Sequence, residues 1–281
     1  MNSIHKILDT GIQKLKKGNI SSSVLDAEII LSNILNIQKE DLILEKKIYV
    51  SNDEAERFYH LINRRLKKEP IAYVLNKKEF WNDNFFVNKN TLIPRPETEL
   101  MVEKLINFSK GKNLRILDIG TGSGCIIISL LKELKKSKGV GLDINSRALS
   151  VAKINLIKSK LSNRLRLVNR SIDDYNDTKF DIIVSNPPYI ERNQIKNLME
   201  DIKYYEPKSA LDGGNDGLDV IKKVIYKSRT ILKNKGLLAI EIGKGQDKKV
   251  SQILRNNKFR EKFLIKDYQS NIRCILSILN F

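Results

Sequence analysis

The sequence predicts an α/β fold in which a mostly parallel sheet follows a small helical domain and a β-hairpin. Three patterns support this: apolar positions at helical spacing before residue 70, aromatic residues around a polar turn after it, and alternating strands and helices from residue 114 onward. The chain has 281 residues, of which 41% are hydrophobic and 30% charged. That length suits one large domain with a small one, and that composition excludes disordered and fibrous proteins.

The first 70 residues are expected to form a helical domain. Apolar side chains recur every three or four positions within 4–15 and again within 25–35, where serines at 21–23 can cap the second helix. Segment 51–66 has acidic residues in its first turn and arginines in its last, which suits the helix dipole. Pro70 ends this region.

Residues 71–94 are expected to form a β-hairpin linker. Aromatic pairs at 80–81 and 85–86 enclose the polar residues 82–84, so these polar residues should form the turn. Packing between two domains is the simplest role for the aromatic side chains.

Residues 95–281 are expected to form one α/β domain. Apolar segments predict strands at 115–119, 140–144, 165–168, 180–184, 236–242, 262–265 and 272–279. Helices are predicted between them at 125–134, 146–160 and 218–232. Because strands and helices alternate, the sheet should be mostly parallel and bind its ligand at the carboxyl ends of the strands. The last two strands have no helix between them and should be antiparallel.

A glycine-rich loop follows the first of these strands. Asp118 lies near the strand end, and the loop contains Gly120, Thr121, Gly122, Ser123 and Gly124. Glycines let the backbone turn sharply and approach a ligand closely. The spacing G-x-G-x-G departs from the G-x-G-x-x-G of dinucleotide sites, which argues against NAD or FAD.

An acidic residue also follows the second strand. Asp143 comes about 20 residues after the loop, where a carboxylate can accept hydrogen bonds from both hydroxyls of a ribose. The glycines alone are weak support, because a structural turn would also use them. Together with Asp118 and Asp143 at two consecutive strand ends, they predict a nucleoside site.

The fourth predicted strand leads into Asn186, Pro187, Pro188 and Tyr189. Prolines cannot continue a central ladder, so the strand ends there and the backbone is stiff. The Asn186 side-chain oxygen and a freed backbone carbonyl supply two acceptors, which suits a planar amino group, and Tyr189 offers a ring face for stacking. The alternative is a strand terminator with a satisfied Asn and a packed Tyr.

The formal net charge is +18, and most of the basic excess falls after residue 90. Such a charge favours a polyanionic partner such as nucleic acid or the ribosome. The lysines are spread along the chain without an RNA-binding motif or zinc-finger spacing, which favours a compositional cause instead.

The sequence predicts a cytoplasmic protein. Only Cys125 and Cys274 are present, which excludes a disulfide scaffold. No apolar stretch approaches 18 residues, and the N-terminus lacks the apolar region of a secretory signal. The two histidines, His5 and His60, lie outside the sheet domain without metal-ligand spacing, so no metal site is expected.

The glycine loop, Asp143 and the Asn-Pro-Pro-Tyr motif resemble those of S-adenosylmethionine-dependent methyltransferases that act on planar amino groups. Further segments match one branch of them: 92–99, 205–207, 210–214, 216–218 and 241–246. Over almost the whole chain, this combination resembles the release factor glutamine methyltransferase family. The resemblance implies a Rossmann-like, seven-stranded methyltransferase sheet in 95–281 and a substrate-binding role for the helical domain 1–70.

The resemblance also implies the reaction: methyl transfer from S-adenosylmethionine to the glutamine side-chain amide of the Gly-Gly-Gln motif in peptide-chain release factors. The implied cofactor residues are Asp118, Gly120, Thr121, Gly122, Ser123, Gly124, Asp143 and Asn186. The implied substrate residues are Asn186, Pro187, Pro188 and Tyr189. The side-chain oxygen of Asn186 and the carbonyl of Pro187 would accept the amide hydrogens, and Tyr189 would hold the amide plane, which makes these three the expected catalytic residues. A monomer that needs neither nucleic acid nor membrane is expected.

The chain departs from the family pattern at two places. Residues 169–173 do not align clearly, so no contact to adenine is assigned there. Between Asp267 and Arg273, Ser270 replaces the usual glycine, which puts a tight turn in question.

Other activities remain open at this point. An adenine-amino nucleic-acid methyltransferase shares Asn-Pro-Pro-Tyr and suits the basic charge, but it would need a target-recognition segment that is not apparent here. A methyltransferase of a ribosomal-protein glutamine has Ser-Pro after the arginine that corresponds to Arg95, where this chain has Pro96 and Glu97. A non-enzymatic binding protein would not be expected to keep Asn-Pro-Pro-Tyr intact.

Overall fold

The computed structural model describes residues 2–44, 49–177 and 179–280. The chain forms two compact units, Met1–Asn76 with Met199–Tyr205, and Lys77–Leu198 with Glu206–Phe281. Within the described residues, no helix has both the length and the apolar character that crossing a membrane requires.

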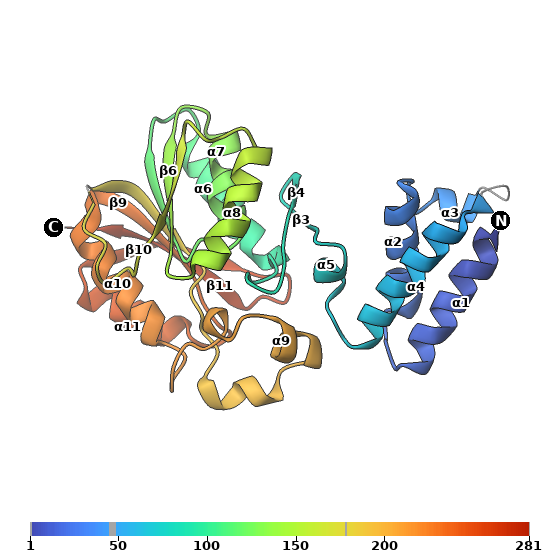
Figure 1. The fold of residues 1–281 in the computed structure, drawn as a ribbon. Helices are drawn as coiled ribbons and strands as arrows, with labels where there is room; N and C mark the ends of the chain where they lie inside the picture. The colour runs from blue at the N-terminus through green and yellow to red at the C-terminus, as the bar shows by residue number, and fades with distance from the viewer. Residues whose placement is uncertain (1, 45–48, 178, 281) are drawn as a thin grey trace. The chain divides into compact units, whose positions relative to one another are not determined.

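The first unit is helical, as predicted. Its elements are β1 (Asn2–Ser3), α1 (Ile4–Lys17), α2 (Ser23–Leu35), α3 (Asp41–Leu44), β2 (Tyr49–Val50), α4 (Asn52–Leu66), α5 (Ile71–Val74) and α9 (Glu200–Tyr205). Figure 1 shows α1, α2 and α4 packed together, and their apolar faces meet around the buried Ile30, Phe58 and Ile62. The first turn of α4 is closed by a capping box between Ser51 and Glu54, as the residue types there favour.

The hairpin forms with a tighter turn than expected. It consists of β3 (Lys78–Phe80) and β4 (Asp83–Phe85), and Phe80 pairs with Asp83. The prediction that residues 82–84 form the turn is therefore wrong, because only Trp81 and Asn82 remain between the strands. Trp81 takes up the left-handed conformation that this turn demands, with φ of 55°. The Trp81 Nε1 donates to Glu133 at 3.0 Å, which ties the hairpin to the rest of the second unit, to which it belongs.

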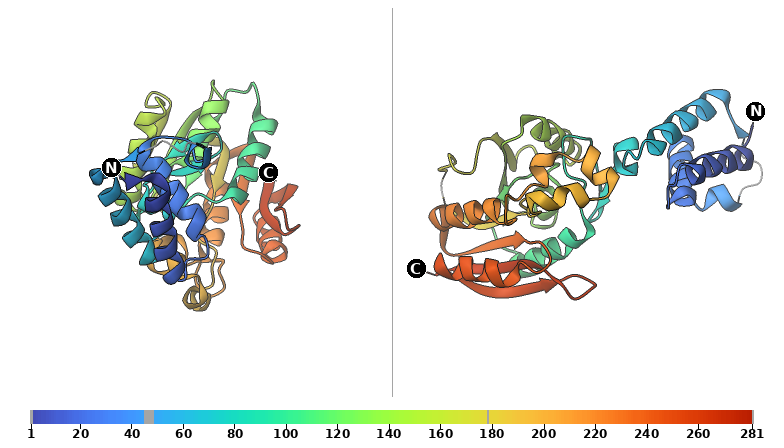
Figure 2. Two further views of the ribbon diagram at one scale, coloured as in Figure 1. Left: turned by 90° about the vertical axis from the view of Figure 1, so that its right-hand side faces the viewer. Right: turned by 90° about the horizontal axis from the view of Figure 1, so that it is seen from below.

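The second unit contains the predicted sheet. Its strands are β5 (Arg115–Ile119), β6 (Lys138–Asp143), β7 (Leu165–Asn169), β8 (Phe180–Ser185), β9 (Leu232–Glu241), β10 (Phe259–Lys266) and β11 (Ile272–Leu279). Their spatial order is β10-β11-β9-β8-β5-β6-β7. The pairs from β7 to β9 are parallel, and β11 is antiparallel to both β9 and β10 (Figure 2, red strands), which confirms the predicted seven-stranded, mostly parallel sheet.

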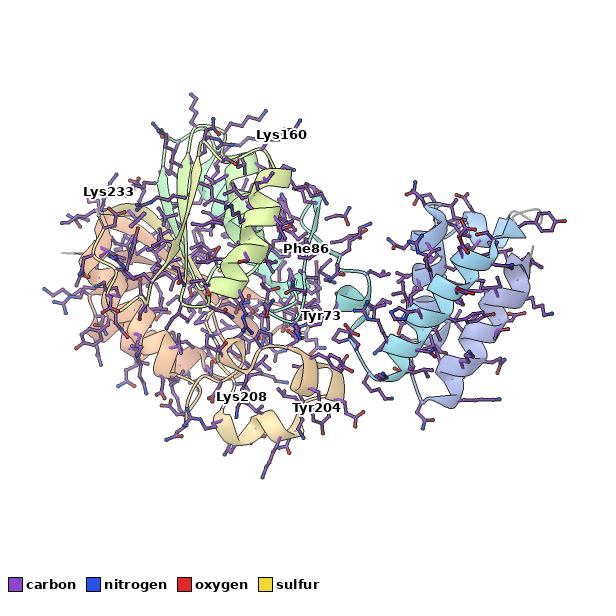
Figure 3. The ribbon with its side chains drawn as sticks, in the orientation of Figure 1. Tyr73, Phe86, Lys160, Tyr204, Lys208 and Lys233 are labelled. Carbon is purple, nitrogen blue, oxygen red and sulfur yellow. The ribbon has the colours of Figure 1, made fainter. Side chains whose placement is uncertain are left out.

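Helices cover both faces of this sheet (Figure 1; the same view with side chains is Figure 3). One apolar core joins the sheet to α6 (Pro96–Ser109), α7 (Cys125–Glu133) and α8 (Ser146–Lys158). A second core joins the opposite face to α10 (Asp219–Ile231) and α11 (Asp247–Asn256). Consecutive residues of one strand therefore enter different cores, as Ile116 and Leu117 of β5 do.

Two α-helices among the described residues of this unit are absent from the predicted set, as are the 3-10 helices Arg192–Asn197 and Lys208–Ala210. Helix α6 begins at Pro96, directly after a proline-containing loop, which hides a helix whose first position accepts proline. Helix α11 buries only Val250, Ser251 and Leu254, so its apolar stripe is narrow within a lysine-rich segment. The tight turn at Ser270 does form: its φ is 65°, and its N–H donates to the carbonyl of Asp267.

Candidate functional site

The glycine loop adopts a conformation that requires glycine. Gly120, Gly122 and Gly124 have φ of 72°, 55° and 80°, a region in which side chains are strained. The loop continues the β5–β6 ladder, because the N–H groups of Gly120 and Thr121 both donate to the Leu142 carbonyl. A side chain at Gly120 would meet no atom within 4 Å, so the loop faces open space.

Asp118 lies beneath this loop and is fully buried. One carboxyl oxygen accepts from the hydroxyl of Thr121 at 2.7 Å. The other has no hydrogen-bond partner among the residues that the structure describes. Burial raises the pKa of Asp118 to about 7, although the hydrogen bond from Thr121 opposes this. Asp118 therefore stabilises the loop through its hydrogen bond with Thr121.

Asp143, the last residue of β6, binds the glycine loop through a backbone N–H. Its carboxylate accepts from the N–H of Gly122 at 2.9 Å and from the N–H of Asn145 at 2.8 Å. Burial raises its pKa, and these backbone hydrogen bonds oppose that rise. A carboxylate offers about four lone pairs, so acceptor capacity remains for a ligand.

The loop, Asp143 and the end of β8 line one pocket of about 290 Å³. Of the predicted site residues, its wall includes Gly120, Thr121, Gly122, Ser123, Asp143, Asn186 and Pro188. Asp118, Gly124, Pro187 and Tyr189 are not part of this wall. The structure thus gathers most of the predicted residues at the carboxyl edge of the sheet, where a parallel sheet places ligands.

Asn186 lies in the pocket wall, and a hydrogen bond to Thr98 fixes its side-chain amide. Its Nδ2 donates to the hydroxyl of Thr98 at 3.3 Å, and that hydroxyl donates to Glu241 at 2.6 Å. Glu241 is fully buried at the end of β9, and burial raises its pKa to about 7. Thr98 also lines the pocket.

The Tyr189 ring is half-buried, and Arg273 holds its hydroxyl. The Nη2 of Arg273 donates to the Tyr189 hydroxyl at 3.1 Å. Burial, with a smaller contribution from Glu241, raises the pKa of Tyr189 to about 12. The ring is therefore neutral at physiological pH and fixed in place next to the pocket.

The backbone after Asn186 is pressed against two glycines of another loop. A side chain at Gly213 would lie 2.8 Å from the Pro188 carbonyl oxygen, and one at Gly217 would lie 2.5 Å from the Tyr189 carbonyl oxygen. The side chain of Gln246 donates to that same Tyr189 oxygen at 3.0 Å. These glycines are thus required by close backbone approach.

An ion pair between the half-buried Arg95 and the buried Glu206 fixes another part of the wall. Glu206 is buried, accepts from Arg95 at 2.6 Å and also accepts from the N–H of Ile93 at 3.2 Å. Arg95 lies in the wall of the pocket. This contact explains why the segments 92–99 and 205–207 occur together in one sequence.

Several lining residues were not predicted from the sequence. They include Arg95, Thr98, Ile144, Arg170 and Ile172. The motif at 92–99 pointed to the first two, although nothing in its pattern indicated their orientation. Ile144 follows Asp143 and is 72% exposed. The sequence pattern does not indicate that this apolar side chain is exposed in a pocket wall.

Two family models match the chain. The model described as "PrmC N-terminal domain" matches residues 6–75, and the model described as "Methyltransferase small domain" matches residues 96–204. The first match lies within the first compact unit, and the second lies in the second unit except for its last residues, 199–204, which belong to the first.

Among solved structures, a methyltransferase from Pyrococcus furiosus has a TM-score of 0.52 at 16% identity, over 82% of this chain and 100% of that one. That likeness concerns the fold. A bifunctional methyltransferase of Rickettsia typhi is 37% identical over 97% of this chain, which spans 57% of that relative. A protein of Clostridium acetobutylicum named release factor glutamine methyltransferase is 37% identical, over 94% of both chains. The chain belongs to the release factor glutamine methyltransferase family.

Proposed function

We infer that this chain methylates the side-chain amide nitrogen of the glutamine in the Gly-Gly-Gln motif of peptide-chain release factors, with S-adenosylmethionine as the methyl donor. The observation that carries this conclusion is the 37% identity over 94% of both chains to a release factor glutamine methyltransferase. The pocket at the carboxyl edge of the sheet, with Asn186 in its wall, provides a site for the chemistry.

The glycine loop and Asp143 are the residues proposed to hold the cofactor. The loop fits this role because its positive-φ glycines leave open space where side chains would project. Asp143 fits because its carboxylate keeps lone pairs for the two ribose hydroxyls. When bound, S-adenosylmethionine supplies an electrophilic methyl group on a sulfonium.

The adenine ring is proposed to lie between apolar side chains near these residues. Ile144 and Ile172 are both in the pocket wall, and they follow the carboxyl ends of β6 and β7, respectively. Aliphatic side chains provide faces against which a planar base can pack. This assignment fills the position that the sequence left without an adenine contact.

The substrate amide is proposed to bind at Asn186 and Pro187. The Asn186 side-chain oxygen and the Pro187 carbonyl would accept its two hydrogens and so orient the nitrogen lone pair. Pro187 is buried, so its backbone is fixed. An amide nitrogen is a poor nucleophile, and positioning of reactants contributes about 7–11 kcal/mol in favourable cases, so alignment should dominate the catalysis. Tyr189, held by Arg273, would support the amide plane from the side.

The helical domain is proposed to bind the protein substrate. Supporting this, residues 6–75 match a separate family model, and the helices have their own apolar core. We take 1–70 as this domain, 71–94 as the hairpin linker and 95–281 as the methyltransferase domain. Because the substrate belongs to the translation machinery, we propose that the chain acts in the cytoplasm. We also propose that it acts as a monomer and needs neither nucleic acid nor membrane.

Transfer of tritiated methyl from S-adenosylmethionine tests this function. The acceptors offered in parallel are a release factor, its variant with alanine for the glutamine of the Gly-Gly-Gln motif, duplex DNA and RNA. We expect label on the wild-type factor alone. Label on nucleic acid with none on the factor would show instead that the chain is an adenine methyltransferase.

A further inference from the structure

A chain of two hydrogen bonds leads from the core to the pocket. Glu241 at the end of β9 accepts from the Thr98 hydroxyl at 2.6 Å, and that hydroxyl accepts from Nδ2 of Asn186 at 3.3 Å. Glu241 is completely buried and Thr98 is 2% exposed, whereas Asn186 is half-buried. The three residues come from the first turn of α6 and from the ends of two neighbouring strands.

The direction of these bonds decides which end of the Asn186 amide faces the pocket. An ionised carboxylate can only accept, so the single hydroxyl proton of Thr98 is directed to Glu241. The Thr98 oxygen can then only accept from Asn186, which requires the NH2 end of that amide. The side-chain oxygen of Asn186 is therefore directed away from Thr98 and is free to accept from another group.

We propose that Glu241 and Thr98 are positioning residues for methyl transfer, which act by keeping the Asn186 side-chain oxygen turned toward the substrate amide. The inference rests on the proposed function, because it concerns how Asn186 accepts a hydrogen from that amide. Neither residue touches the reacting atoms in this account. Their effect is on the orientation of one side chain.

Protonation of Glu241 allows both hydrogen bonds to reverse their direction. A neutral carboxyl can donate to Thr98, whose hydroxyl can then donate to the oxygen of Asn186 and turn its amide round. The remaining carboxyl oxygen of Glu241 has no hydrogen-bond partner in the described part of the chain, so no hydrogen bond at that oxygen opposes its protonation. The activity should therefore increase as Glu241 loses its proton.

The surroundings of Glu241 place that change near neutral pH. Burial raises the pKa of Glu241 to about 7, and the bond from Thr98 and the charge of Arg273 oppose the rise. The titratable and charged groups around it are Arg95 and Glu97 before and within α6, Arg273 and Cys274 on β11, Cys125 at the start of α7, and Tyr189. Burial raises the pKa values of Cys125, Cys274 and Tyr189 and keeps these three neutral around pH 7.

Steady-state kinetics of release-factor methylation across pH, at saturating S-adenosylmethionine, test the proposal. The variants are Thr98→Val, Thr98→Ser and Glu241→Gln. The control is Ser228→Ala, which removes a buried hydroxyl of α10 that has no partner among the described residues. At saturating cofactor, kcat reports the groups that titrate in the enzyme–substrate complex, and comparison of the wild type with Glu241→Gln separates the contribution of Glu241 from those of Asp118 and Asp143.

We expect Thr98→Val to lower kcat about 10- to 100-fold, the scale of a small misplacement in a site, with KM for both substrates within roughly twofold of the wild type. Thr98→Ser should restore kcat because it keeps the hydroxyl. Wild-type kcat should rise as pH increases through about 7. In Glu241→Gln this rise should be absent, and Ser228→Ala should match the wild type throughout.

Two results would overturn the positioning role while leaving the function intact: wild-type kcat in Thr98→Val, or an unchanged pH profile in Glu241→Gln, each with an active wild type. A loss in Thr98→Val that Thr98→Ser does not restore would also overturn it, because the hydroxyl would not be the cause. If the wild-type enzyme methylates no release factor, both the function and the positioning role are wrong.

Discussion

Asn186 connects the sheet to the wall of the pocket. It is the first residue after β8, and the prolines that follow end the strand at the edge of the pocket. Its NH2 group is bound to Thr98, which leaves its oxygen for the ligand. The chemistry assigned to Asn186 therefore depends on a single acceptor atom.

Replacement of that atom should slow the reaction without loosening the cofactor. We expect Asn186→Ala to lower kcat about 10²-fold or more, the scale of losing one preorganised polar group. The affinity for S-adenosylmethionine should stay within about twofold, since we propose that Asp143 and the glycine loop supply most of the contacts to the cofactor. Methylation assays and calorimetry measure the two quantities. Asn197→Ala, which changes an exposed asparagine of the 3-10 helix Arg192–Asn197, is the matched control, and equal turnover by Asn186→Ala and this control would refute the role.

Asp143 should act on cofactor binding. Asp143→Asn keeps the shape of the side chain but places an NH2 group where the carboxylate accepts from Gly122 or from a ribose hydroxyl. We expect the dissociation constant for S-adenosylmethionine to rise by at least about tenfold, because hydrogen bonds to charged groups contribute roughly 1.5–3 kcal/mol. Calorimetry measures it. The exposed Asp174→Asn serves as control, and an affinity equal to that of this control would contradict the assignment.

At this scale the sequence predicted residues whose positions follow from strand ends. Gly120, Gly122, Asp143 and Asn186 could be placed together because the carboxyl ends of parallel strands share one edge. Glu241 and Thr98 could not be joined, since 143 positions separate them and no periodicity reports a contact over that distance.

At the scale of elements, the position of the glycine loop depends on how closely α7 packs on β6. Gly139 and Gly141 of β6 lie on the α7 face of the strand, and their neighbours Val140 and Leu142 enter the opposite core. The missing side chains let α7 approach the sheet. The loop before α7 then lies directly over the strand end that carries Asp143.

Filling this space should destabilise the fold. A Cβ at Gly139 would lie 2.8 Å from a side-chain carbon of Ile127 and 3.0 Å from one of Leu131. We expect Gly139→Ala to lower the free energy of unfolding by about 1–3 kcal/mol, the usual cost of overpacking. Urea denaturation measures this change, with the exposed Lys138→Ala in the same strand as control. Equal midpoints for the two variants would show that the contact is not tight.

Element types were predictable where periodicity was strong and ambiguous where it was not. The strands β5 and β11 have the predicted bounds, because apolar side chains predominate in both segments and polar or glycine residues lie beside them. Helix α11 was missed because its buried stripe is short, and the hairpin turn was placed late because strand pairing used polar residues that composition assigns to a turn. Packing against the sheet decided the first case, and pairing of β3 with β4 decided the second.

At the scale of the whole molecule, the site carries a cost in stability. Asp118 and Glu241 are both fully buried, and burial raises the pKa of each to about 7. Carboxyls of this kind hold their protons more tightly in the folded state than in the unfolded state. Their stabilising contribution is complete below the unfolded-state pKa and is lost as pH rises through about 7.

The free energy of unfolding should therefore fall between about pH 4.5 and pH 7. For Glu241, a rise in pKa from 4.5 to about 7 corresponds to about 3 kcal/mol. We expect Glu241→Gln to gain up to that amount relative to the wild type between pH 5 and pH 8, as measured by urea denaturation. Glu103→Gln, at an exposed position of α6, should show no such gain, and parallel pH curves for wild type and Glu241→Gln would contradict the account.

The most direct test of the central claim locates the methyl group. A release factor incubated with the enzyme and S-adenosylmethionine is digested, and the peptide containing Gly-Gly-Gln is sequenced by tandem mass spectrometry. We predict one added methyl on the glutamine side chain with the wild-type enzyme and little or none with Asn186→Ala. A methyl group on another residue, or equal modification by the wild type and Asn186→Ala, would contradict it.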